Sequence, residues 1–372
     1  MFAPLVLALA PVTAWASDFH SPFVLAPASL APTEAAFVAR CGPVDGALTQ
    51  VARRAAEERA HGTPMDSARL GHELRLRGAP YVWPRLWMIT GHGLGDAPSL
   101  DALAPWRASL HPLGERRCGA GIAQDANGLE VVAVVMVDVL ADLAPLPTRV
   151  RAGQWLTVDA TLRRTAEDAR VFVAGANGIP RSVPTSRRGS HVIARFAPDR
   201  PGRFTVQVMV DGDRGPRPVL EALVFAEVEP ADEAPGVPGE DTQPVGPADQ
   251  ALERNVAGLR HAFALPPLVR DVRLDALARA HAAAMAKAQT AAHDLGAGDP
   301  IERLRDAGLT ARDAGENVAS ARTALEAHRA LYASPSHRAN LLRPEFRRVG
   351  FGVERDARGM LWVAELFASG LR

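Results

Sequence analysis

Three short segments in the last third of the chain carry polar residues whose types suit chemistry. His293 lies in an Ala-Ala-His-Asp segment, Glu316 in Gly-Glu-Asn, and His337 in Ser-Pro-Ser-His-Arg-Ala-Asn. Imidazoles and carboxylates are ligands for zinc-like metals, and the same groups act as general acids and bases. Because Gly and Pro surround each group, we expect the three side chains to meet at one small cleft.

Further polar side chains of the same segments would line that cleft. The predicted binding cleft consists of His293, Glu316, Asn317, Ser334, His337, Arg338 and Asn340. His293 and His337 would be the metal ligands, and in a hydrolytic reaction Glu316 and His337 would be the catalytic groups. Each residue also has a structural explanation, because Asn stabilises turns and buried polar networks make a fold rigid.

The elements around these residues predict a C-terminal domain, residues 248–372, of helices on a small sheet. Apolar side chains at helical spacing run from Leu274 to Met285, and a capping-box pattern opens another helix at Thr323. A β-hairpin is expected near the C-terminus. Two further histidines, His281 and His328, lie in apolar stripes, so we expect both to be core residues.

Composition divides the middle of the chain into two parts. Residues 230–247 are rich in Pro, Gly, Asp and Glu, which predicts an extended, flexible linker. Residues 147–229 alternate apolar and polar side chains in short runs separated by turn residues. This pattern predicts an all-β sandwich that resembles immunoglobulin-like modules. It carries no recognisable chemistry, so we expect a spacer.

An internal match organises the N-terminal third. Residues 116–133 match residues 347–364 without a gap, including two glycines and an Asp-Ala-x-Gly turn. We therefore expect residues 17–146 to be a degenerate α+β copy of the C-terminal domain. In this copy Gly91-His92-Gly93 would stand where the C-terminal domain has Gly315-Glu316-Asn317, so the site would be lost.

The first residues have the pattern of an export signal. An apolar run from Leu5 to Val12 precedes Ala14-Trp15-Ala16, which predicts a signal peptide over residues 1–16; the alternative is a buried apolar N-terminus. Export favours a disulfide between Cys41 and Cys118, worth about 4–5 kcal/mol for so long a loop; the alternative is two buried thiols.

Bulk properties narrow the classes of function. With 372 residues the chain is long enough for two or three domains. The 42 Lys and Arg residues balance the 42 Asp and Glu residues, so nucleic-acid binding has no electrostatic support. No stretch beyond the signal peptide approaches the roughly 20 apolar residues of a membrane span.

In combination and order, the motifs of residues 249–369 resemble those of the CAP superfamily, which takes in cysteine-rich secretory proteins, antigen 5 and pathogenesis-related proteins. The pattern is similar to that of bacterial SCP-like extracellular domains. The segments that carry the resemblance are Leu265–Leu268, Ala280–Ala282, Met285, His293, Gly315–Ala319, Ser334–Leu342, Val349–Val353, Trp362–Val363 and Phe367.

The resemblance implies an α-β-α sandwich with a cleft lined by two His and two Glu, which in some members binds a divalent metal. Carried over by motif, His293, Glu316 and His337 take three of these positions. Ser334 stands at about the position of the second Glu, so the set is incomplete. A Ser hydroxyl does not replace a carboxylate as an anionic ligand.

Two functions from different classes follow. The first is a secreted, periplasmic or cell-envelope binding module, which takes a lipid, glycan or protein through the C-terminal cleft and requires no cofactor. The second is a peptidase-like hydrolase that uses His293, Glu316 and His337 with a divalent metal such as zinc. A third explanation makes the three side chains a purely structural network.

Overall fold

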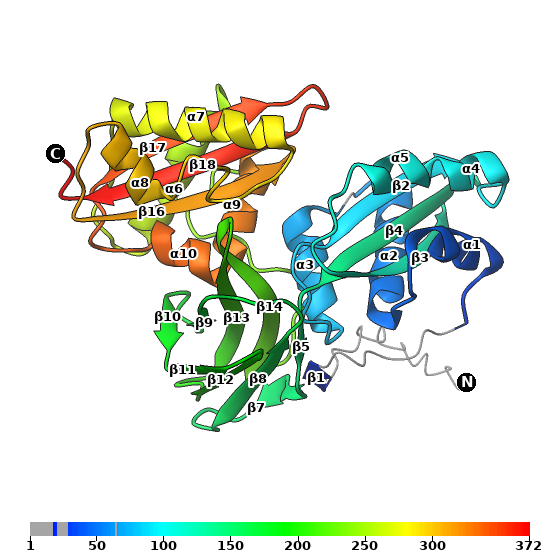
Figure 1. Ribbon diagram of the computed structural model, residues 1–372. Helices are drawn as coiled ribbons and strands as arrows, with labels where there is room; N and C mark the ends of the chain where they lie inside the picture. The colour runs from blue at the N-terminus through cyan, green and yellow to red at the C-terminus, as the bar shows by residue number, and fades with distance from the viewer. Residues whose placement is uncertain (1–17, 21–28, 64) are drawn as a thin grey trace, which may run out of the picture.

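The computed structural model describes residues 18–20, 29–63 and 65–372, which form three lobes (Figure 1). The predicted export signal, residues 1–16, lies outside the described residues. Within the described ranges, no helix is both long and apolar enough to cross a membrane.

The N-terminal lobe is a three-stranded antiparallel sheet between two layers of helices, with strand order β2-β4-β3. Helices α2 and α3 pack on one face, and α1 and α5 pack on the other. A disulfide joins Cys41 to Cys118, as predicted. The elements are α1 (Pro32–Cys41), α2 (Gly46–Ala60), α3 (Ser67–Leu76), β2 (Arg85–Gly91), α4 (Ala97–Asp101), α5 (Leu103–Ala108), β3 (Glu115–Gln124) and β4 (Glu130–Val139).

The middle lobe is a β-sandwich of two sheets around one apolar core. The sheets have strand orders β10-β9-β13-β14-β7 and β11-β12-β8-β5, and a short β1–β6 pair lies beside them. Because β5 pairs with β8, the sandwich begins ahead of residue 147. The strands are β1 (Phe19–His20), β5 (Ala141–Leu143), β6 (Leu146–Pro147), β7 (Arg149–Val150), β8 (Leu156–Leu162), β9 (Ala169–Ala174), β10 (Pro180–Val183), β11 (Thr185–Arg188), β12 (His191–Phe196), β13 (Gly202–Gly212) and β14 (Gly215–Ala226).

The C-terminal lobe is the predicted α+β domain. Its sheet, ordered β15-β17-β18-β16, lies between α7 and α8 on one face and α6, α9 and α10 on the other (Figure 1). The elements are α6 (Ala248–Ala262), β15 (Val269–Arg270), α7 (Val272–Ala288), α8 (Pro300–Asp306), β16 (Asp313–Ala321), α9 (Ala324–Ala333), α10 (Pro335–Leu341), β17 (Arg348–Arg355) and β18 (Leu361–Ser369).

Two glycines on β17 allow α7 to lie directly on the sheet. A Cβ atom added to Gly350 would lie 2.2 Å from the carbonyl carbon of Leu274, and one on Gly352 would lie 2.1 Å from that of Ala278. No side chain fits at such distances, so the backbone of α7 takes that space. The stripe predicted from Leu274 to Met285 faces the same side of the sheet.

The N-terminal lobe repeats this close approach between α2 and β3. A Cβ on Gly119 would lie 2.1 Å from the backbone nitrogen of Thr49, and one on Gly121 would lie 2.1 Å from that of Arg53. The strand order β2-β4-β3 also corresponds to β16-β18-β17. The two lobes therefore have the same core arrangement of one helix on one hairpin.

Strand pairing corrects the position expected for the lost polar motif. Gly119 and Gly350 are the first glycines of the two hairpins. Two strands across the N-terminal sheet from Gly119 lies Leu86, and two strands across the C-terminal sheet from Gly350 lies Glu316. The motif Gly91-His92-Gly93 instead ends β2 and begins the following turn, where Gly93 has φ +65°. Leu86 occupies the position of Glu316, and the placement of Gly91-His92-Gly93 there is wrong.

Residues 230–247 pack against the C-terminal lobe, in contrast to the flexible linker predicted from their composition. Val237 is buried in the apolar core that α6 and α9 share. Glu240 forms two hydrogen bonds with the Arg329 guanidinium of α9, at 2.8 and 2.9 Å. Val237, the ion pair of Glu240 and the contacts of Asp241 with α6 hold the segment in place, although its composition could not build a core of its own.

Candidate functional site

Glu316 is the centre of a buried polar network on the face of the sheet that α7 covers. Its Oε2 accepts a hydrogen bond from Nδ1 of His293 at 3.0 Å, and its Oε1 accepts one from Nη2 of Arg303 at 2.5 Å. His281 Nε2 lies 3.6 Å from Oε2. Since an ionised carboxylate only accepts hydrogen bonds, His293 and Arg303 are its side-chain donors.

The surroundings of Glu316 keep its carboxylate ionised. Burial alone would raise its pKa, but the hydrogen bond from His293 and the positive charges around it, including that of Arg303, hold the pKa below its usual value. Burial lowers the pKa of His281, although the Glu316 charge opposes this shift. Each carboxylate oxygen accepts one side-chain hydrogen bond inside the protein.

His337 of α10 approaches His293, as predicted. The centroids of the two rings lie 6.3 Å apart and their planes are tilted by 47°. Desolvation, followed by the neighbouring His293, lowers the pKa of His337 to about 3. His337 is therefore a neutral imidazole at pH 7, and the three segments that carry His293, Glu316 and His337 do converge.

Asn317 and Asn340 attach α10 to the sheet and do not line an open cleft. Asn317 is fully buried, and its Nδ2 donates to the backbone oxygen of His337 at 3.2 Å and to Oε2 of Glu365 at 3.1 Å. Asn340 Nδ2 donates to Oδ1 of Asn317 at 3.0 Å. Burial raises the pKa of Glu365 to about 7, so this carboxylate titrates near neutral pH.

Ser334 and Arg338 face the middle lobe. Gln207 of β13 donates from Nε2 to the Ser334 hydroxyl at 2.9 Å, and its Oε1 accepts the Ser336 amide at 2.9 Å. Arg338 donates from Nε to the Tyr332 carbonyl at 2.5 Å, and its guanidinium lies 4.0 Å from the centroid of the Tyr332 ring. The Ser-Pro-Ser-His-Arg segment thus docks α10 on the sandwich.

The turn between β13 and β14 covers His293. The carbonyl oxygen of Arg214 accepts hydrogen bonds from the backbone amides of His293 and Asp294, both at 3.2 Å. Gly215 has φ +85°, and a Cβ there would lie 2.8 Å from the Cβ of His293. Figure 1 shows the tip of this hairpin reaching the C-terminal lobe beside α10. The turn therefore occupies the space over His293 where the cleft was predicted.

The donor set at this site does not fit a catalytic zinc ion. Such sites use three protein ligands and an open position. Both oxygens of Glu316 are bonded, and the hydroxyl of Ser334 is bonded to Gln207. His293 and His337 remain, and within the described residues no group of three or more His, Cys, Asp or Glu side chains could hold a metal.

Several residues of the site carried no signal in the sequence. Arg303 lies on α8 and Gln207 on β13, neither of them in a motif. His281 was predicted to be a core residue, and it is buried with Nε2 bonded to the Ala292 carbonyl at 2.8 Å. Its proximity to Glu316 was not predicted. Only the tertiary fold brings these groups together.

Comparisons with known proteins identify the C-terminal lobe. Residues 254–366 match the model of the cysteine-rich secretory protein family, CAP. An outer surface protein from Borrelia burgdorferi is 22% identical over 33% of this chain and 92% of that chain, with a TM-score of 0.30. An extracellular protein containing a SCP domain from Bacillus anthracis is 16% identical over 74% of this chain and 93% of that chain, with a TM-score of 0.31.

A cysteine-rich secretory protein from Staphylococcus aureus is 13% identical over 62% of this chain and 82% of that chain, with a TM-score of 0.29. No curated protein matches the chain.

Proposed function

The C-terminal lobe is a CAP-superfamily domain, and from this premise we propose that the chain is a secreted protein whose C-terminal cleft binds polypeptide segments. At the coarse level a CAP domain marks an extracellular protein of the interaction type. The finer proposal is a location in the periplasm or cell envelope and a protein as the partner. No cofactor is required for this role.

The observation that carries the proposal is the contact between the cleft and the β13–β14 turn. Two adjacent backbone amides, of His293 and Asp294, donate to one peptide carbonyl, that of Arg214. Gly215 lies against the His293 side chain without room for a Cβ. Backbone hydrogen bonds combined with a steric filter are the usual means of recognising polypeptide. This contact favours a protein partner over a lipid or a glycan.

The hydrolase alternative has less support from the same geometry. A general base works best with a pKa near the operating pH. The pKa of Glu316 is below its usual value, and that of His337 is about 3. Neither group would accept a proton readily at pH 7, and Glu316 is held by Arg303 as well as by His293.

We propose that the other lobes serve this binding role. The N-terminal lobe would be a degenerate CAP-like copy, which is supported by the shared strand order and by the glycine contacts of Gly119 and Gly121. The middle lobe would be an immunoglobulin-like spacer that carries the covering turn. In this arrangement the sandwich controls access to the cleft.

A substitution at Gly215 tests the proposal in the full-length chain. Gly215→Ala places a methyl group against His293 and so displaces the turn. A synthetic hairpin peptide of residues 208–220 should then bind the variant saturably and one-to-one in isothermal titration. The wild type should bind the peptide at least about tenfold more weakly, since its own turn fills the cleft.

Gly189→Ala provides the matched control. Gly189 has φ +61° in another turn of the sandwich, and a Cβ there meets nothing within 4 Å. This variant carries similar backbone strain but leaves the cleft covered, so it should behave as the wild type. Absence of peptide binding to a folded Gly215→Ala variant would contradict polypeptide recognition by the cleft.

A further inference from the structure

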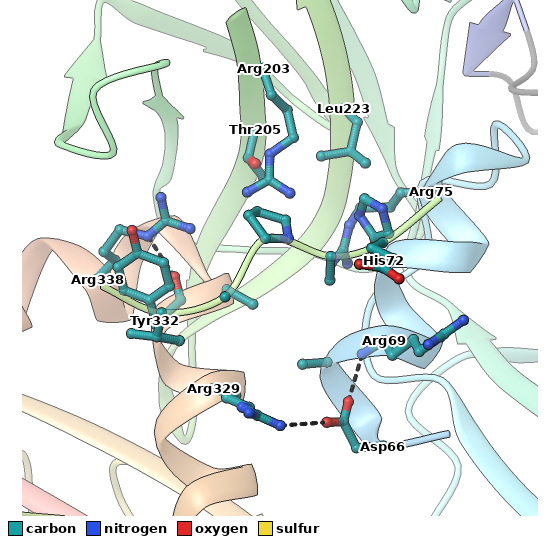
Figure 2. Close-up of a pocket in the computed structure, with 17 residues that line it drawn as sticks. Asp66, Arg69, His72, Arg75, Arg203, Thr205, Leu223, Arg329, Tyr332 and Arg338 are labelled. Carbon is teal, nitrogen blue, oxygen red and sulfur yellow. Dashed lines mark hydrogen bonds and ion pairs between the residues drawn. The ribbon is translucent and has the colours of Figure 1, made fainter. Parts of the chain in front are cut away.

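A cavity of about 350 Å³ lies where the three lobes meet, away from the His293 contact (Figure 2). Its walls come from α3, β13, α9 and α10, and from residues 233–237. Five arginines contribute to the walls, namely Arg69, Arg75, Arg203, Arg329 and Arg338. All three lobes therefore supply positive charge to one space that is partly open to solvent, and two carboxylates, Asp66 and Glu233, also line it.

Three of these arginines have carboxylate partners. The pairs are Arg69 with Glu58, Arg75 with Glu221 and Arg329 with Glu240, at nitrogen–oxygen distances of 2.6, 2.6 and 2.8 Å. Their charges are balanced within the protein. The positive charges of the other two arginines in the walls, Arg203 and Arg338, are not paired with a carboxylate in this way.

Arg203 and Arg338 have no carboxylate partner in the described parts of the chain. Arg338 is buried, and its guanidinium contacts the Tyr332 ring and the carbonyls of Tyr332 and Gly178. The Arg203 side chain forms neither a hydrogen bond nor an ion pair with the described residues. Figure 2 shows its side chain extending from β13 into the cavity.

The positive charges are close enough to affect one another. Burial, with the charges of Arg338 and Arg75, lowers the pKa of Arg203 to about 10. Arg75 Nε is a buried donor without an acceptor among the described residues. An uncompensated charge in a protein interior is costly, and an orphan buried donor commonly marks the place of an ion or a water molecule. An anion from outside would satisfy both conditions.

We propose that this cavity binds the phosphoryl group of a small molecule. Guanidinium groups recognise oxyanions through paired N–H donors. Here they come from three lobes, which suits a tetrahedral phosphoryl group better than a planar carboxylate with two oxygens. Thr205, two residues after Arg203 on the same face of β13, adds a hydroxyl donor at the wall. The volume falls in the range of small-molecule sites.

Titration of the full-length chain tests this site, with inorganic phosphate and glycerol 3-phosphate as probes in phosphate-free, low-chloride buffer. We expect one-to-one binding of at least one probe, and an affinity at least about tenfold lower in Arg203→Gln, because a charged donor is lost. The Arg203 side chain has no hydrogen bond within the described residues to lose, so the variant should fold as the wild type does.

Arg181→Gln is the matched control, since it removes one positive charge from an exposed position on β10 of the same sheet. Its affinity should stay within about twofold of the wild type. Tighter binding of glycerol 3-phosphate than of phosphate assigns the site to phosphomonoesters, and the reverse assigns it to free phosphate. Acetate, a planar carboxylate, is titrated as a third probe. The proposal would be overturned by equal affinity in Arg203→Gln and wild type, by binding of acetate but of neither phosphate compound, or by no binding at all.

Discussion

The N-terminal and C-terminal lobes have the same arrangement of helix and hairpin and differ in the side chains that their strands carry on the two faces of the sheet. In both, an Asp caps the helix that lies on the glycines of the hairpin, Asp45 in α2 and Asp271 in α7. In both, an Asp side chain accepts two backbone amides in the hairpin turn, Asp125 in one and Asp356 in the other. The positions of Glu316, Asn317 and Glu365 are taken in the N-terminal lobe by Leu86, Trp87 and Val134.

The difference separates the requirements of the fold from those of the site. Leu86 and Val134 join the apolar clusters of the N-terminal lobe, where their counterparts Glu316 and Glu365 form ion pairs and hydrogen bonds. The scaffold therefore forms with either filling. The arrangement of helix and hairpin in the N-terminal lobe does not need these polar residues.

The largest expected effect on stability comes from disrupting the close contact between helix and hairpin glycines, which both lobes have. Gly121→Ala and Gly352→Ala each place a methyl group within 2.1 Å of helix backbone. Each should destabilise its own lobe by at least about 3 kcal/mol, because the helix must move off the sheet. Lobe-specific hydrogen exchange would locate the loss in the N-terminal lobe for the first variant and in the C-terminal lobe for the second.

The hairpin turns supply the control for these glycines. Gly128→Ala and Gly359→Ala meet nothing within 4 Å but have φ of +78° and +80°. Strain alone should cost about 1–2 kcal/mol in each lobe. If Gly121→Ala or Gly352→Ala costs no more than this, the glycine contacts do not define the shared scaffold.

An intermediate effect is expected where the lobes differ. Glu316→Gln leaves the Arg303 guanidinium buried without its counter-charge, which should lower the free energy of unfolding by about 3 kcal/mol. The double variant Arg303→Met/Glu316→Leu copies the apolar filling of the N-terminal lobe and should recover most of that loss. Urea denaturation measures both. A Glu316→Gln variant as stable as the wild type would instead reopen the hydrolase alternative.

A smaller, pH-dependent effect concerns Glu365, whose counterpart Val134 does not titrate. Its pKa is raised to about 7 in the folded state, against 4.5 for the free side chain. The folded state therefore holds the proton more tightly, so stability is full below pH 4.5 and falls as pH rises toward 7. Between pH 5 and pH 7 the loss should be about 2 kcal/mol.

Glu365→Gln should remove this slope, since an amide does not titrate and its oxygen can still accept from Asn317. The readout is the free energy of unfolding at pH 5, 6, 7 and 8, followed by hydrogen exchange in the C-terminal lobe. An unchanged slope in the variant would assign the pH dependence to another group.

The features that depend on a few neighbouring residues, such as turns and helix starts, could be predicted from the sequence. The Gly-rich hairpin and the helix opened at Thr323 follow from turn residues and periodicity. The meeting of His293, Glu316 and His337 was predicted only from the Gly and Pro residues around them, and their distances come from the fold. The disulfide between Cys41 and Cys118 followed from cysteine count and the predicted export signal, and the structure contains it.

Contacts between distant segments could not be predicted in this way. Gln207 is one of many polar residues in a strand, and nothing in its neighbourhood indicates that it bonds to the Ser334 hydroxyl of another lobe. Val237 is a single apolar residue in a polar segment, so composition predicted a free linker where burial holds the chain. The contact of Arg214 with the cleft depends on the relative position of two lobes, which no motif encodes.

The turn at Arg214 reaches the cleft from within the same molecule and so competes with any outside partner at a fixed local concentration. A tethered segment commonly presents an effective concentration on the order of millimolar. An outside polypeptide must compete with the turn, so its apparent dissociation constant is larger than its intrinsic one. The factor is about the effective concentration of the turn divided by the dissociation constant of the turn for the cleft. Weak, abundant peptides would leave the cleft closed, and only a tight or multivalent partner would open it.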